Sequence, residues 1–232
     1  MHDLAARLAD VRDRIARAAD RARRDPSRIR LLSVSKTFDA AHVRAAALGG
    51  QIDFGENKVQ EAQHKREETA DLPLRWHLIG HLQSNKTAKA AALFDVIHSI
   101  DTPALVKKID AAAAAAGRSL ELLVQVDLAG EATKHGAREA DLPAIFEAAS
   151  GCTAVRMTGL MTLPPATENA EGARTWFREL ARCRDRLLAS GIDPGCLAEL
   201  SMGMSHDYEI AIEEGSTIVR VGTAIFGSRP PL

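Results

Sequence analysis

The first strand-like run of the chain reads Ile29-Arg30-Leu31-Leu32-Ser33-Val34-Ser35-Lys36. Aliphatic residues dominate this run, and a helix-like segment follows it, so the run predicts a buried strand that leads into a helix. The same order recurs to the end of the chain. The predicted strands cover residues 30–35, 51–54, 75–79, 95–99, 120–126, 154–160, 198–201 and 217–221.

The segments between these strands have the apolar spacing of helices. The predicted helices cover residues 39–48, 57–69, 84–92, 102–116, 139–149, 168–190 and 205–214, with Asp39, Thr102 and Ser205 as N-caps. Alternating strands and helices require a parallel sheet, and eight strands allow the sheet to close. We therefore predict a single (β/α)8 barrel domain over residues 1–232. An open doubly wound sheet is the alternative, weakened because no G-x-G-x-x-G follows the first strand.

Residues 2–24 predict an additional N-terminal helix, because apolar residues recur there at helical spacing. Acidic residues of this segment precede arginines by four positions in three pairs: Asp10 and Arg14, Asp13 and Arg17, and Asp20 and Arg24. Such pairs stabilise an exposed helix. The pattern predicts a solvated outer face, with an anion-docking face as the weaker alternative.

Composition excludes several classes of protein. The 232 residues carry a formal net charge of −1, so no overall basic field indicates a nucleic-acid or membrane partner. The N-terminus lacks the apolar core of a signal peptide, and no run approaches transmembrane length. Cys152, Cys183 and Cys196 have neither disulfide-framework nor zinc-site spacing. These features predict a soluble, cytoplasmic protein.

Two histidines have a spacing that metal sites use. His77 and His81 match H-x-x-x-H, but they flank Gly80 at a strand end. The helical face that such a metal-binding pair requires is therefore absent, and we predict no metal site from this pair.

Polar residues gather where the predicted strands end. Lys36 ends the first strand, Asn57 follows the second, and two loops of small residues follow the last two strands. These loops are Leu200-Ser201-Met202-Gly203-Met204-Ser205 and Arg220-Val221-Gly222-Thr223. In a (β/α)8 barrel the ligand lies at this end, and a phosphate commonly lies after strands seven and eight.

The two loops have the chemistry of a phosphate site. Gly203 and Gly222 let the backbone approach a ligand, and the N–H groups of Gly222 and Thr223 would open a short helix. The hydroxyls of Ser201 and Thr223 can donate to phosphate oxygens, and Ser205 either does the same or caps the next helix. The alternative for the first loop is a tight turn without a ligand. A phosphate site opposite an amine, Lys36, indicates pyridoxal 5'-phosphate (PLP), an aldehyde that carries a phosphate.

Arg220 ends an otherwise apolar strand. A buried guanidinium requires partners because it does not deprotonate, so a structural ion pair with a barrel carboxylate is one role. If Arg220 faces the pyridine nitrogen of PLP instead, its positive charge disfavours protonation there. The ring would then be a weak electron sink. Asn57 can offer an amide to the ring substituents or can cap a helix.

Several motifs resemble one family. They include Ser35-Lys36, Phe54-Gly55-Glu56-Asn57-Lys58-Val59-Gln60-Glu61, Trp76-His77-Leu78-Ile79-Gly80-His81-Leu82-Gln83-Ser84-Asn85-Lys86, Gly159-Leu160-Met161, the Ser201–Ser205 loop and Gly215-Ser216-Thr217-Ile218-Val219-Arg220-Val221-Gly222-Thr223-Ala224-Ile225-Phe226-Gly227. Together they resemble the pyridoxal phosphate homeostasis protein family over nearly the whole chain. The segment 125–136 departs from the family's usual asparagine-containing version.

The resemblance implies a barrel similar to the N-terminal domain of alanine racemase, with PLP held as an imine on Lys36. It also implies that Ser201, Gly203, Gly222 and Thr223 hold the phosphate, that Arg220 faces the ring nitrogen, and that Asn57 contacts the cofactor. A role in vitamin B6 homeostasis follows from the same match.

The cofactor chemistry leaves enzyme and carrier open. A racemase needs a second acid or base, which the similar racemases take from an additional β domain. Here that domain is missing, and Tyr208 is the single tyrosine. We therefore predict a non-catalytic, monomeric PLP carrier that releases PLP to apoenzymes. The alternatives are a weak PLP-dependent racemase and a cofactor-free barrel that uses Lys36 on a phosphorylated sugar.

Overall fold

Eight parallel strands close into a barrel in the computed structural model, which describes residues 2–130 and 135–228. The strands are β1 (Arg30–Val34), β2 (Asp53–Glu56), β3 (Arg75–Leu78), β4 (Val96–Ile100), β5 (Leu120–Gln125), β6 (Val155–Met161), β7 (Glu199–Ser201) and β8 (Ile218–Val221). β1 pairs with β8 in parallel, with Leu31 opposite Val219. The predicted barrel is confirmed, and the open sheet is wrong because this pairing leaves no free edge.

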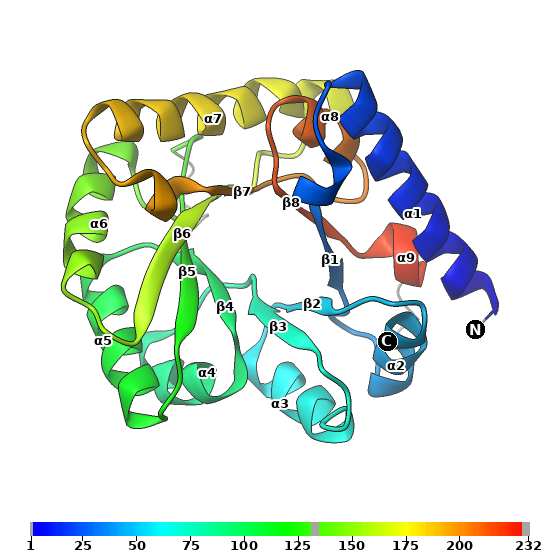
Figure 1. Ribbon diagram of the computed structural model, residues 1–232, viewed down its shortest axis with the longest axis horizontal. Coiled ribbons are helices and arrows are strands. Elements are labelled where there is room, and N and C mark those ends of the chain that lie inside the picture. The colour runs from blue at the N-terminus through cyan, green and yellow to red at the C-terminus, as the bar shows by residue number, and fades with distance from the viewer. Residues whose placement is uncertain (1, 131–134, 229–232) are drawn as a thin grey trace.

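Helices surround the barrel (Figure 1). They are α1 (His2–Arg21), α2 (Ala40–Leu48), α3 (Val59–Glu68), α4 (Thr87–Leu93), α5 (Pro103–Ala115), α6 (Leu142–Ser150), α7 (Arg174–Ala189), α8 (Tyr208–Glu213) and α9 (Thr223–Phe226). The largest difference from prediction is at α7, where a 3-10 turn at Ala170–Ala173 precedes the helix. Within the described residues, no helix combines the length and apolarity needed to cross a bilayer.

Two of the three predicted N-caps are confirmed. The carboxylate of Asp39 accepts a hydrogen bond from the N–H of His42, and the hydroxyl of Thr102 accepts one from the N–H of Leu105. The prediction for Ser205 is wrong, because α8 begins three residues later, with Asp207 at the N-cap position. The Ser205 hydroxyl instead accepts hydrogen bonds from backbone N–H groups that follow β8.

The core has two parts. The larger part lies between the strands and the surrounding helices. A smaller cluster joins residues of five strands, and such residues can meet only inside the barrel: Leu32, Val96, Leu123, Met161 and Ile218. The barrel interior is therefore filled by side chains, as in other barrels of this size.

The N-terminal helix α1 lies against α8 and α9 (Figure 1). The predicted pair of Asp10 and Arg14 is present, with the nitrogen and oxygen 3.9 Å apart. Arg14 approaches Glu209 of α8 more closely, at 2.7 Å, and Arg21 pairs with the same carboxylate. Arg24 donates to the carbonyl of Ile212 and not to Asp20. The predicted solvated face is present, since Asp10, Asp13, Arg17 and Asp20 are exposed, and Arg14, Arg21 and Arg24 at its border also attach α1 to α8.

Candidate functional site

Lys36 follows β1 by two residues, at the carboxyl end of the barrel. The strand lies between β2 and β8, so the chain leaves the barrel between the loops of its two neighbours. On one side the N–H of Ser35 donates to the carbonyl of Gly55 at 3.1 Å. On the other side a Cβ on Gly222 would lie 3.2 Å from the carbonyl oxygen of Val34. The fold thus brings the Lys36 turn next to the second predicted phosphate loop.

A buried ion pair supports the backbone just before Lys36. The Lys65 ammonium of α3 donates to the carbonyl of Ser35 at 2.7 Å and to the Glu56 carboxylate at 2.6 Å. The Ser35 hydroxyl donates to the same carboxylate oxygen at 2.6 Å. Burial raises the pKa of Glu56, although the charge of Lys65 opposes this shift. Sequence reasoning missed Lys65, because no local pattern links it to Glu56.

Asn57 lies at the end of β2, beside the loop that follows β3. A Cβ on Gly80 would lie 2.2 Å from the carbonyl oxygen of Asn57, so the two loops are in close contact. The helix α3 begins after Asn57, with Lys58 at the N-cap position. Asn57 is therefore not the helix cap, and its contact with a cofactor stays a prediction.

The two predicted phosphate loops are joined to each other. The Ser205 hydroxyl accepts hydrogen bonds from the N–H groups of Gly222 at 3.2 Å and Ala224 at 3.3 Å. The N–H of Arg220 donates to the carbonyl of Gly203 at 3.0 Å. Gly222 caps α9, which begins at Thr223, so the predicted short helix is present. In this structure the acceptor at this helix end is therefore the Ser205 hydroxyl.

Replacement of Gly203 with alanine is expected to destabilise the fold at this loop. Gly203 has a φ of +92°, and its Cβ would lie 2.5 Å from Cβ of Ala211 on α8. Strain and overpacking together predict a loss of about 2–4 kcal/mol in the free energy of unfolding, measured with urea. Gly117 is the matched control, since its φ is +63° and nothing lies within 4 Å of its Cβ. Equal losses of unfolding free energy in Gly203→Ala and Gly117→Ala would show that the contact with Ala211 does not destabilise the first variant.

Arg220 is buried at the end of β8, where its guanidinium donates to the Ser201 hydroxyl at 2.7 Å and to the carbonyl of Thr162 at 2.8 Å. Burial lowers its pKa to about 10, an effect that the charge of Asp207 opposes. In the described part of the chain, Arg220 makes no ion pair with a carboxylate within 4.0 Å. Among the described residues, Arg220 therefore does not form the structural ion pair that the sequence allowed as one of its roles.

A chain of hydrogen bonds runs from Arg220 through the barrel interior. The Ser201 hydroxyl lies 2.9 Å from Nδ1 of His98, and Nε2 of His98 lies 2.9 Å from Nδ1 of His77. Nε2 of His77 lies 2.8 Å from the Asp53 carboxylate. Burial opposes ionisation of Asp53, but the bond from His77 and nearby arginines lower its pKa. The sequence did not reveal this chain, because its members come from β2, β3, β4, β7 and β8.

The two ends of the chain fix the direction of every hydrogen bond. The guanidinium can only donate and the ionised carboxylate can only accept, so with both imidazoles neutral each link donates toward Asp53. The pKa directions of the two histidines favour the neutral rings. Burial lowers the pKa of His98 well below its usual range, and the neighbouring His77 and Arg220 add to this effect. Burial lowers the pKa of His77 as well.

This chain predicts a loss of stability in mild acid. A neutral buried histidine with a lowered pKa takes up a proton more readily after unfolding, so stability falls as pH decreases below about 6.5. Each histidine contributes a slope of up to about 1.4 kcal/mol per pH unit. Urea unfolding of the wild type between pH 7.5 and 5.5 measures the slope, which should be smaller in His98→Gln. An unchanged slope in that variant would show that His98 does not carry the effect.

Tyr208 is buried in the packing of α8 against α1. Its ring lies under the Arg14 guanidinium, with the carbon of that group 5.3 Å from the ring centre. Burial raises the pKa of its phenol to about 12. Tyr208 is therefore a packing residue of the interface between α8 and α1.

Comparison with known proteins identifies relatives over the full barrel. A family model described as alanine racemase, N-terminal domain, matches residues 7–230. The pyridoxal phosphate homeostasis protein of Pseudomonas aeruginosa is 44% identical over 229 residues, which are 99% of this chain and 97% of the relative.

Two solved structures add to this. PipY of Synechococcus elongatus, solved with PLP bound, is 40% identical with a TM-score of 0.86, and the match covers 97% of this chain and all of PipY. An alanine racemase of Clostridium difficile has a TM-score of 0.73 at 16% identity and shows the shared fold alone. The match covers all of this chain but 58% of the racemase. The chain belongs to the pyridoxal phosphate homeostasis protein family, which is built on the alanine racemase N-terminal barrel.

Proposed function

We propose that this protein binds PLP as a covalent imine on Lys36 and acts as a non-catalytic carrier in PLP homeostasis. The observation that carries the proposal is the contact between the Lys36 turn and the Gly222 loop across Val34. The Lys36 turn is therefore adjacent to the loop that opens α9, and an aldehyde that carries a phosphate requires an amine and anion-binding backbone groups near each other. The PLP-bound structure of PipY, a relative over its whole length, supports the same assignment.

The residues present fit the phosphate. Gly203 and Gly222 stand where a Cβ would crowd the backbone, and the N–H groups of Gly222 and Thr223 lie at the start of α9. The Ser205 hydroxyl lies among these donors, so we assign Ser205 to the phosphate along with Gly203, Gly222 and Thr223. Ser201 was predicted to contact the phosphate too, but its hydroxyl already bonds Arg220 and His98. We therefore assign Ser201 chiefly to holding Arg220.

Arg220 would face the ring nitrogen, and Asn57 would contact the ring substituents from the neighbouring strand end. When bound, PLP supplies a reactive aldehyde and an electron-withdrawing ring. The positive charge of Arg220 disfavours a proton on the ring nitrogen, which weakens that electron sink. The bond from Ser201 and the histidine chain behind it hold the guanidinium in place.

Three features support a carrier over an enzyme. The weak electron sink is the first, and the packing of Tyr208 between α8 and α1 is the second, since it removes the single tyrosine as a catalytic acid or base. The third is that curated relatives are named as homeostasis proteins. A reversible imine keeps a reactive aldehyde sequestered until apoenzymes take it up. We place this role in the cytoplasm and assign it to a monomer.

The test is an absorption spectrum of the purified protein with added PLP, followed by borohydride reduction and peptide mass spectrometry. A visible band and a pyridoxyl adduct on Lys36 are expected. If neither a band nor an adduct appears, the PLP assignment is wrong. The alternative of a cofactor-free barrel that uses Lys36 on a phosphorylated sugar then gains support. Exchange of an amino-acid α-hydrogen in heavy water, lost in Lys36→Ala, would instead favour the weak racemase.

A further inference from the structure

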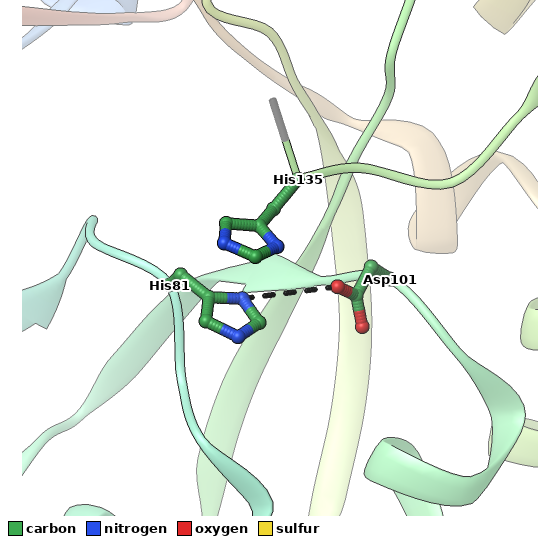
Figure 2. Close-up of side chains that lie close together, drawn as sticks. All are labelled: His81, Asp101 and His135. Atoms are coloured by element: carbon green, nitrogen blue, oxygen red, sulfur yellow. Dashed lines mark ion pairs between the residues drawn. The ribbon is translucent and has the colours of Figure 1, made fainter. Parts of the chain in front are cut away.

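Three potential metal ligands meet at the carboxyl end of the barrel. His81 follows β3, Asp101 follows β4 directly, and His135 lies in the loop after β5 (Figure 2). Consecutive parallel strands end at the same rim, so their loops are neighbours. In the sequence, His81 pairs by spacing only with His77. In the structure His77 is fully buried and is hydrogen-bonded to Asp53 and His98. The partners of His81 come from other strands.

The three side chains converge closely. Their ligand atoms all lie within 4.8 Å of one another. The rings of His81 and His135 stack with centres 3.5 Å apart and planes 9° apart, and the Asp101 carboxylate faces them (Figure 2). Nδ1 of His81 lies 3.9 Å from the nearer carboxylate oxygen. Zinc bonds of about 2.1 Å in tetrahedral geometry separate neighbouring ligand atoms by about 3.4 Å, so metal binding would draw the ligand atoms together and tilt the stacked rings toward one ion.

The Asp101 carboxylate supplies the anionic member of the group. Its side chain is 18% exposed, and among the described residues its ion-pair partner is His81 at 3.9 Å. A cation bound between the carboxylate and the two imidazoles would contact all three groups.

We propose that His81, Asp101 and His135 bind one divalent transition-metal ion of the zinc class. Two imidazoles and one carboxylate suit Zn²⁺ or Co²⁺, whereas Mg²⁺ and Ca²⁺ require oxygen ligands throughout. Three protein ligands leave a fourth position for water or a small ligand. The three ligands are different residues from Lys36 and from those of both phosphate loops, so metal binding can be tested without PLP.

The test is a titration of tag-free, PLP-free protein with Zn²⁺ by calorimetry, and with Co²⁺ by visible spectroscopy. Wild type is expected to bind one ion, with the Co²⁺ absorption of a tetrahedral site. His81→Ala and Asp101→Asn are each expected to weaken binding by at least about tenfold, since even changes behind the ligands cost that much. His64→Ala is the matched control, because His64 is exposed and has a single carboxylate partner, Glu68, at 2.7 Å.

Thermal unfolding gives an independent readout. Zinc that binds only the folded state raises the melting temperature of the wild type. The rise should persist in His64→Ala and disappear in the His81→Ala and Asp101→Asn double variant. No binding by the wild type, or unchanged binding by the double variant, would overturn the proposal. Since all titrations are made without PLP, failure of the imine test leaves this result unaffected.

Discussion

Replacement of Lys36 with alanine is expected to abolish the covalent PLP adduct and its visible absorption band. An imine requires a primary amine beside the aldehyde, and Lys36 follows the Val34 carbonyl that lies against Gly222. The change leaves the proposed phosphate loops untouched, so the variant should retain weak, non-covalent binding. Absorption spectra with added PLP measure the first effect, and mass spectrometry after borohydride reduction locates the adduct.

Lys58→Ala is the control for this experiment. Lys58 is an exposed lysine at the start of α3, paired with Glu61 at 3.2 Å. Its removal should leave both the band and the Lys36 adduct unchanged. A full-strength band in Lys36→Ala, with the adduct moved to another lysine, would show that the imine forms elsewhere.

Replacement of Lys65 with methionine is expected to cause a large loss of stability, about 3–5 kcal/mol in the free energy of unfolding. The change leaves the Glu56 carboxylate buried without its cation, and it removes a hydrogen bond to the carbonyl of Ser35. Urea unfolding at pH 7 measures the loss. Lys58→Met, which breaks an exposed ion pair, should change stability by less than about 1 kcal/mol.

The pH dependence of the Lys65→Met variant gives a further check. Burial already raises the pKa of Glu56, and the loss of Lys65 should raise it more. The folded state of the variant then binds a proton that the unfolded state releases, so its deficit should shrink as pH falls from 7 toward 5. Adding Glu56→Gln should recover much of the loss. A loss of less than about 1 kcal/mol in the free energy of unfolding at pH 7 would contradict the claim that the Lys65–Glu56 pair stabilises the Lys36 turn.

The sequence was sufficient to predict the barrel. All eight strands lie within two residues of the predicted bounds, because short strand-like runs alternate with helical segments along the whole chain. The caps at Asp39 and Thr102 could be read from local residue types for the same reason. The start of α8 could not, because the Ser205 hydroxyl bonds to a loop that is distant in sequence.

The candidate site shows the same contrast between local sequence features and tertiary contacts. Sequence by itself determined the residues that follow the strands, Lys36, Asn57, Gly203, Arg220 and Gly222 among them, because a strand's end and its small residues are local features. Only the tertiary structure decided what holds them: Lys65 behind the Lys36 turn, and His98 and Asp53 behind Arg220. It also decided that Asp101 lies beside His81. These contacts join separate strands and helices, and only the folded barrel brings such residues together.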